Sequence, residues 1–373
     1  MNNYNYKDLT KVEKIERQKE IMRVFLKLGS LAFGGPAAHI AMMEEEIIDK
    51  KKWISREKFM DLIGATNLIP GPNSTELAIH LGYERGGLLG LFLAGTFFIF
   101  PATIIVLLFA FIYTRYGSIP QIGSVLYGMK PVIMAIILQA LYRLARSVIK
   151  NKLSLLIGIF TISVYLLGIK EIPLLFASGL IMMFIQNKEK IKKNIFGVSI
   201  LPLYLIFLTF LKIGSVLYGS GYVLLAFLES EFVDKLSLLT NQELLDAVAV
   251  GQLTPGPVFT TATFIGYLLN GIMGAIFATI GIFLPSFLLV WVLNPVIPRL
   301  RNSSWLSGLL DGINIASLSL MAAVSFKLGM SSLTDILAII IFIISLFSLI
   351  KLKINSTWVI VAGGLVGWIS SLI

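Results

Sequence analysis

The chain has 373 residues, of which 56% are hydrophobic and only 14% are charged, about half the charged share of a typical globular protein. A soluble domain cannot bury that much apolar surface, so the composition excludes a cytosolic enzyme, a secreted disulfide scaffold and a disordered chain and leaves a bilayer as the solvent. The net charge of +10 indicates positive-inside membrane topology, because no nucleic-acid-binding motif accompanies it. With no cysteine and two histidines, neither a thiolate nor an all-histidine metal site is expected, and no cofactor motif is present.

Residues 1–24 predict a cytosolic amphipathic N-terminal helix. Residues 4–23 are highly charged and lack the apolar core of a signal peptide. The remaining chain is dominated by apolar stretches that are long enough to cross a bilayer. We expect crossings at 86–113, 123–145, 153–169, 172–186, 195–213, 271–293, 309–327, 333–350 and 356–373.

The chain is a duplicated unit. FLKLGSLAFGG at Phe25–Gly35 recurs as FLKIGSVLYGS at Phe210–Ser220, and NLIPGP at Asn67–Pro72 recurs as QLTPGP at Gln252–Pro257, both at an offset of 185 residues. About 120 residues align with a single one-residue gap, after which the offset is 184. We therefore predict a first membrane repeat at 25–187, a basic linker with an extra crossing at 188–209, and a second membrane repeat at 210–373.

The second repeat is predicted to be inverted relative to the first. The loop Lys50–Lys58 carries five Lys and Arg residues, whereas its counterpart Lys235–Glu243 carries one. Because Lys and Arg set sidedness, the first loop should face the cytosol and the second the outside. The crossing at 195–213 has no counterpart in the first half and would produce this inversion, with 24 of the 31 Lys and Arg residues lying before residue 195. This topology places the N-terminus in the cytoplasm and the C-terminus outside the plasma (inner) membrane.

The expected fold is an all-α polytopic membrane protein with two inverted-topology repeats and broken or re-entrant helices at Gly-Pro motifs. Inverted repeats of this kind are common in secondary transporters, where interrupted helices line the binding site. Irregular backbone is tolerated at membrane depth only where protein or a watery cavity covers it. The segments that we expect to be broken are 25–42, 60–82, 214–228 and 244–266.

The two Pro-Gly-Pro motifs are the strongest candidates for a site. Each proline removes a backbone donor and favours a helix start, so one helix should end before the motif and another begin after it. The new helix would present free N–H groups and hydroxyls to an anion; a plain proline kink is the alternative. The predicted substrate-binding residues are Asn67, Pro70, Gly71, Pro72, Asn73, Ser74 and Thr75 at the first motif, and Gln252, Thr254, Pro255, Gly256, Pro257, Thr260 and Thr261 at the second.

Six further residues at matching places in the two repeats are candidates for the same site. The small residues would either line the cavity with backbone amides or allow close helix packing. The lysines would either attract an anion or extend to the membrane interface. These residues are Gly34 and Gly35 with Gly219 and Ser220, and Lys27 with Lys212.

Glu76 and His80 are candidates for proton coupling. Glu76 has no acidic counterpart, because Thr261 occupies that position in the second repeat. A carboxylate beside a broken membrane helix is a proton-relay candidate. Histidine titrates near neutral pH, although a packing or interface role is favoured for both His39 and His80. We expect a different set of acidic residues to pair with Lys at the membrane edge, with proton coupling as the alternative: Glu44, Glu46 and Asp49, and their counterparts Glu229, Glu231 and Asp234.

Taken together, these motifs resemble the chromate ion transporter family in its long, two-domain form. The matching elements include FLKLGSLAFGGP at Phe25–Pro36, N-x-x-PGP-x-x-T at Asn67–Thr75 and GYERGG at Gly82–Gly87, and the resemblance covers nearly the whole chain. It implies a plasma-membrane protein that moves chromate, often by export, with sulfate as a second substrate to consider, and functionally sensitive Gly-Gly-Pro and Pro-Gly-Pro positions.

Other functions stay open at this point. A channel-like anion pathway, a carrier of another oxyanion and a non-transporting membrane sensor or scaffold are the alternatives. An intramembrane enzyme is disfavoured, because no nucleophile–base set or metal cluster is evident and no catalytic residue is assigned. The expected partners are the oxyanion and the bilayer, and no nucleic acid is expected. The one protein partner that we consider is a second copy of the chain, in a homodimer.

Overall fold

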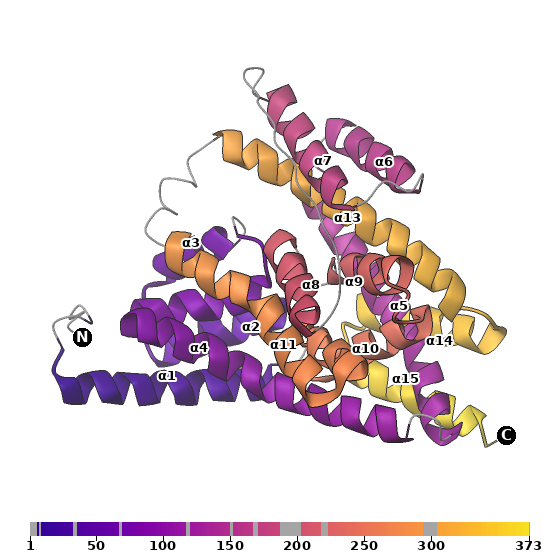
Figure 1. The fold of residues 1–373 in the computed structure, drawn as a ribbon, viewed down its shortest axis with the longest axis horizontal. Helices are drawn as coiled ribbons and strands as arrows, with labels where there is room; N and C mark the ends of the chain where they lie inside the picture. Colours follow the sequence, from indigo (N-terminus) through magenta and orange to yellow (C-terminus); the bar gives the residue numbers. More distant parts are fainter. Residues whose placement is uncertain are drawn as a thin grey trace.

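The structure is a computed structural model that describes residues 6, 9–32, 36–66, 69–116, 120–149, 152–166, 171–186, 203–217, 223–293 and 304–372. Over these residues the regular elements are helices, without strands (Figure 1). Four helical segments are long and apolar enough to span a membrane, at Asn73–Tyr116, Ile122–Arg146, Val258–Val292 and Gly308–Ser332. The chain is therefore an all-α polytopic membrane protein, as the sequence predicts.

The two halves present corresponding elements in the same order. The first half contains α1 (Lys11–Leu31), α2 (Pro36–Met43), the π-helix η2 (Glu44–Lys50), α3 (Arg56–Thr66), α4 (Asn73–Tyr116), α5 (Pro120–Val148), α6 (Lys152–Leu166) and α7 (Glu171–Gln186). The second half contains α8 (Leu203–Val216), α9 (Leu224–Leu228), the π-helix η3 (Glu229–Lys235), α10 (Asn241–Leu253), the 3₁₀ turn η4 (Val258–Thr260), α11 (Thr261–Leu293), α13 (Ser304–Ser332), α14 (Ile336–Ile350) and α15 (Ser356–Ser370).

Helix α1 joins the charged N-terminal segment to the first repeat without a break. Thr10 caps the helix through a reciprocal pair of hydrogen bonds with Glu13, and the helix then continues to Leu31. The expected boundary at residue 24 thus lies inside one continuous helix. The division into domains remains a prediction, and most of the linker and extra crossing at 188–209 lies outside the described residues.

The long elements α4 and α11 are each a short helix that turns back into a long one. The helical backbone is interrupted at Gly86–Gly87 in α4 and at Asn270–Gly271 in α11. In each element, backbones approach closely across the turn through glycines with no side chain to separate them. The facing residues are Gly82 and Gly90 in α4, and Gly266 and Gly274 in α11. The expected crossings from residues 86 and 271 therefore begin at these turns.

Each half contributes a helix that packs against two helices of the other half. In Figure 1, α5 of the first half lies with α14 and α15 of the second, while α13 of the second half lies with α6 and α7 of the first. The long elements α4 and α11 pack against each other and against α1 and α8. The correspondence between the elements of the two repeats accounts for this reciprocity. That this relation inverts the second repeat in the membrane remains a prediction.

Candidate functional site

Each Pro-Gly-Pro motif separates two helices, as the prolines predict. Helix α3 ends at Thr66 and α4 begins at Asn73, whereas α10 ends at Leu253 and η4 begins at Val258. Both motifs are buried. Their central glycines have positive φ angles of 139° at Gly71 and 91° at Gly256, a backbone conformation that side chains with a Cβ rarely adopt. We call Pro70–Pro72 the first loop and Pro255–Pro257 the second loop.

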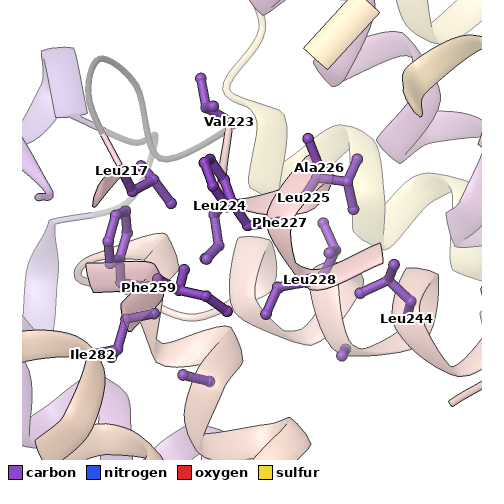
Figure 2. Close-up of a cluster of buried hydrophobic side chains, with 14 of the residues drawn as sticks. Leu217, Val223, Leu224, Leu225, Ala226, Phe227, Leu228, Leu244, Phe259 and Ile282 are labelled. Carbon is purple, nitrogen blue, oxygen red and sulfur yellow. The ribbon is translucent and has the colours of Figure 1, made fainter. Parts of the chain in front are cut away.

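Each loop is hydrogen-bonded to the other repeat. The Gly71 N–H donates to the carbonyl oxygen of Leu217, the residue after α8, at 2.8 Å. The Gly256 N–H donates to the carbonyl oxygen of Ala32, the residue after α1, at 3.0 Å. Figure 2 shows Leu217 near Phe259, which follows the second loop, among buried apolar side chains. Both loops therefore lie where the two repeats meet.

His39 of α2 joins the two loops through hydrogen bonds. Its Nε2 lies 3.0 Å from the Ala32 carbonyl oxygen, and its Nδ1 lies 3.1 Å from Ser74 Oγ. A carbonyl oxygen can only accept, so Nε2 carries the proton and Nδ1 accepts from the Ser74 hydroxyl. The same Ala32 carbonyl accepts from Gly256, so a continuous network runs from the second loop to the start of α4.

Glu76 is completely buried against the first loop. The Ser286 hydroxyl of α11 donates to Glu76 Oε1 at 3.3 Å, while Oε2 has no hydrogen-bond partner among the described residues. Thr75 Oγ1 and Gln252 Nε2 are likewise buried without such a partner. Buried polar atoms are usually hydrogen-bonded, so unpaired ones beside both loops indicate a place that a ligand or water can satisfy.

The threonine hydroxyls of the second loop have partners within their own chain segment. Thr254 donates to the Gly251 carbonyl at 3.1 Å, Thr260 to the Pro257 carbonyl at 2.9 Å, and Thr261 to the Val258 carbonyl at 2.7 Å. In this conformation these hydroxyls are therefore engaged as donors. An anion that binds here would require them to rotate.

Lys27 and Lys212 do not lie unpaired at the loops. Lys27 Nζ is 2.8 Å from Glu46, and Lys212 pairs in the same way with Glu231. Their side chains remain 51% and 41% exposed, so both lie near the protein surface. Burial raises the pKa of Glu231, but Lys212 and Lys235 more than offset it and hold this pKa below its usual value.

The expected pairing with lysine is confirmed for Glu46, Glu229, Glu231 and Asp234, whereas Glu44 and Asp49 pair with an arginine. Arg56 pairs with Glu44 and Asp49 in the first repeat, whereas Lys327 pairs with Glu229 and Asp234 in the second. Together with the lysine pairs above, these contacts hold both π-helices to neighbouring helices.

The other candidates are placed as follows. His80 is buried on α4, one turn after Glu76 and on the same face. Five predicted site residues lie outside the described part of the chain: Gly34, Gly35, Asn67, Gly219 and Ser220. The described residues contain no cluster of His, Cys, Asp and Glu that could hold a metal ion.

A cavity of about 300 Å³ lies between α4 and α11 but does not suit an anion. Phe92 and Phe287, which line it, stack with their ring centroids 5.8 Å apart. Ile99 and Phe283 add further apolar surface, and the hydroxyls of Thr103 and Thr279 in its lining donate to carbonyl oxygens of their own helices. An oxyanion needs polar donors or positive charge, so the loops are the better candidate site.

Two residues that the sequence reasoning did not assign to the site are brought to it by the fold. His39 was expected to have a packing or interface role, and Ser286 was not considered. The residue before Ser286 is Pro285, the repeat counterpart of Pro101, and this match is the one sequence feature that could have directed attention there.

Known proteins resemble this chain over most of its length. The profile of the chromate transporter family matches residues 19–184 and again residues 204–368. The chain is 31% identical to a probable chromate transport protein from Synechococcus elongatus, with 94% of each chain covered. It is 30% identical to a chromate transport protein from Cupriavidus metallidurans, with 92% of this chain and 91% of that one covered. An uncharacterized transporter from Methanocaldococcus jannaschii is 27% identical, with 99% and 98% covered.

No solved structure matches the chain. The family profile matches the chain twice, so the duplication is confirmed. Members of this family are multi-pass membrane transporters rather than enzymes. From these sequence matches, the chain belongs to the chromate transporter family.

Proposed function

We propose that this protein is a secondary transporter of tetrahedral oxyanions that exports chromate across the plasma membrane, with sulfate as a second substrate. In this proposal the N-terminus is cytoplasmic, the C-terminus is outside, and the repeats are inverted. Similarity to chromate transport proteins supports chromate as the substrate. The distribution of Lys and Arg residues supports the orientation.

The single observation that carries the site is the reciprocal docking of the two loops. The Gly71 and Gly256 amides each bind the other repeat, and unpaired polar atoms of Thr75 and Gln252 lie beside them. Interrupted helices at a repeat interface are where secondary transporters bind substrate. We infer that the anion binds between the loops, where it would exchange the interrepeat hydrogen bonds for its own.

Membrane voltage favours export of a divalent anion. Moving one charge across 100 mV changes its free energy by about 2.3 kcal/mol, so a dianion that leaves a negative interior gains roughly 4.6 kcal/mol. Export therefore needs no further driving ion, whereas concentrative uptake needs a cotransported cation. Chromate and sulfate are tetrahedral dianions of similar size, so neutral amide and hydroxyl donors would discriminate weakly between them.

Glu76 and His80 are the proposed proton-coupling residues. Glu76 touches the first loop and the Ser286 hydroxyl, so a change in its protonation would be felt directly where the repeats meet. Lys27 and Lys212, which are half exposed, are proposed to attract the anion rather than to hold it.

The test is flux of labelled chromate and sulfate in proteoliposomes with imposed voltage and pH gradients. We expect flux that saturates, is stimulated by anion on the opposite side and follows voltage. Replacing Pro70–Pro72 or Pro255–Pro257 with alanines should abolish it, and normal flux in both variants would refute the site. Current that rises linearly with concentration would indicate a channel, and absence of flux in the wild type would indicate a sensor or scaffold.

A further inference from the structure

A buried cluster of charged and polar side chains contains none of the loop residues described above. Lys130 Nζ of α5 is 3.1 Å from Asp246 Oδ1 of α10, and the two side chains are only 7% and 4% exposed. The Tyr113 hydroxyl of α4 donates to Asp246 Oδ2 at 3.0 Å. Within the part of the chain that the structure describes, Lys130 is the only buried lysine or arginine.

The cluster lies between the repeats and close to the second loop. Lys130 and Tyr113 belong to the first repeat, whereas Asp246 belongs to the second, on the helix that leads into the second loop. Helices α5 and α10 pack against each other (Figure 1). Ile137, about two helical turns beyond Lys130, borders the same small cavity as Gln252 and Val258. One helix face thus connects Lys130 with the second loop.

The ion pair breaks the symmetry of the repeats. The positions that correspond to Asp246 and Lys130 are Asp61 and Asn314, so the related place has no lysine. Asp61 is exposed on α3. A buried ion pair adds little net stability, because desolvation of the two charges offsets their attraction. The requirements of the fold therefore do not account for a lysine at this position.

A dianion inside the protein needs a positive counter-charge. The amide and hydroxyl groups at the loops are neutral donors, and an anion transferred from water to an apolar interior without a partner is strongly destabilised. In the structure the charge of Lys130 is balanced by Asp246. Tyr113 binds the other oxygen of this carboxylate, so Asp246 keeps one hydrogen bond when Lys130 leaves it.

We propose that Lys130 is a binding residue for the divalent oxyanion and that Asp246 is its counter-ion when the site is empty. The incoming anion replaces the Asp246 carboxylate as the partner of Lys130. This inference rests on the proposed transport of oxyanions, to which it adds the charged part of the binding site.

The experiment compares the wild type with Lys130→Met/Asp246→Asn, Asp246→Asn and the matched control Asp61→Asn. The double variant removes both charges and leaves none buried without a partner. Purified proteins are assayed for chromate and sulfate flux in liposomes, and for the shift in melting temperature that each anion produces relative to chloride. We expect the double variant to melt near the wild type in chloride, to lose the anion-dependent shift, and to lose at least tenfold in flux. Asp61→Asn should behave like the wild type.

Asp246→Asn alone provides a second and independent result. Removing the competing carboxylate should lower the half-saturating anion concentration severalfold, and an unchanged or higher value would overturn the proposal. Wild-type flux in the double variant would overturn it as well and would show that the pair is structural. A wild type that moves neither anion would instead refute the proposed function itself.

Discussion

The first loop should tolerate no side chain at Gly71, and a graded series of Gly→Ala variants measures why. Gly71 has a φ of 139°, and a Cβ there would overlap Glu76 Oε1 and Ser286 Oγ. Gly271, at the turn within α11, also has positive φ (53°) but has open space around it. Gly123 has open space and no positive φ. The series therefore separates backbone strain from steric overlap.

Strain at positive φ costs about 1–3 kcal/mol, and overpacking of a buried site costs about 1–3 kcal/mol more. We expect Gly123→Ala to be as stable as the wild type or slightly more stable. Gly271→Ala should be destabilised by backbone strain alone. Gly71→Ala should be destabilised by strain and by steric overlap, roughly 2–6 kcal/mol in total. The melting temperatures in detergent should fall in this order. Flux in liposomes should fall at least tenfold for Gly71→Ala alone. Equal melting temperatures for Gly71→Ala and Gly271→Ala, with full flux in both, would refute the reasoning.

Three further predictions concern single side chains. Glu76→Gln keeps the shape of the side chain but cannot exchange a proton, so flux should lose its dependence on a pH gradient and keep its dependence on voltage. His39→Phe removes two buried hydrogen bonds and leaves Ser74 unpaired, so it should destabilise the protein by about 1–3 kcal/mol, with His39→Gln between it and the wild type in thermal unfolding. The Tyr127 hydroxyl donates to Asp335 Oδ1 at 2.6 Å and holds the pKa of Asp335 below its usual value. Folding lowers this pKa, so the ionised Asp335 stabilises the folded protein above the unfolded pKa, and this stabilisation is lost as the pH falls through the folded pKa. Asp335→Ala should therefore lower the free energy of unfolding by about 1 kcal/mol at neutral pH and by less in acid.

Local features of the sequence predicted the helical breaks well. Proline removes a donor and restricts its neighbour, so the ends of α3 and α10 beside the loops follow from Pro70 and Pro255 alone. Of the nine apolar stretches that we expect to cross, four overlap helices long and apolar enough to span a membrane, and the other five overlap shorter apolar helices. By contrast, the change from charged to apolar residues near position 24, where we place a domain boundary, lies inside the continuous helix α1, because such a change does not by itself interrupt a helix.

The contacts that build the site depend on partners far apart in the chain. Gly71 binds Leu217, and Gly256 binds Ala32, and neither pairing has a local signal in the sequence. Composition placed Lys130 in an apolar stretch but could not show that Asp246 would meet it there. A duplicated sequence predicts which elements correspond, whereas the exchange of α5 and α13 between halves depends on how the repeats pack.

The unequal loops follow from the charge of the proposed substrate. If Thr261 were a glutamate like its counterpart Glu76, two carboxylates would lie where the loops meet, and each would repel both the other and an entering dianion. A neutral second loop avoids this repulsion and leaves amide and hydroxyl groups for the anion. The one buried lysine of the described chain lies on the side of that neutral loop. The duplicated scaffold thus places a carboxyl group beside one loop and the Lys130–Asp246 ion pair near the other, so a carrier built in this way could handle a proton and a dianion at separate places.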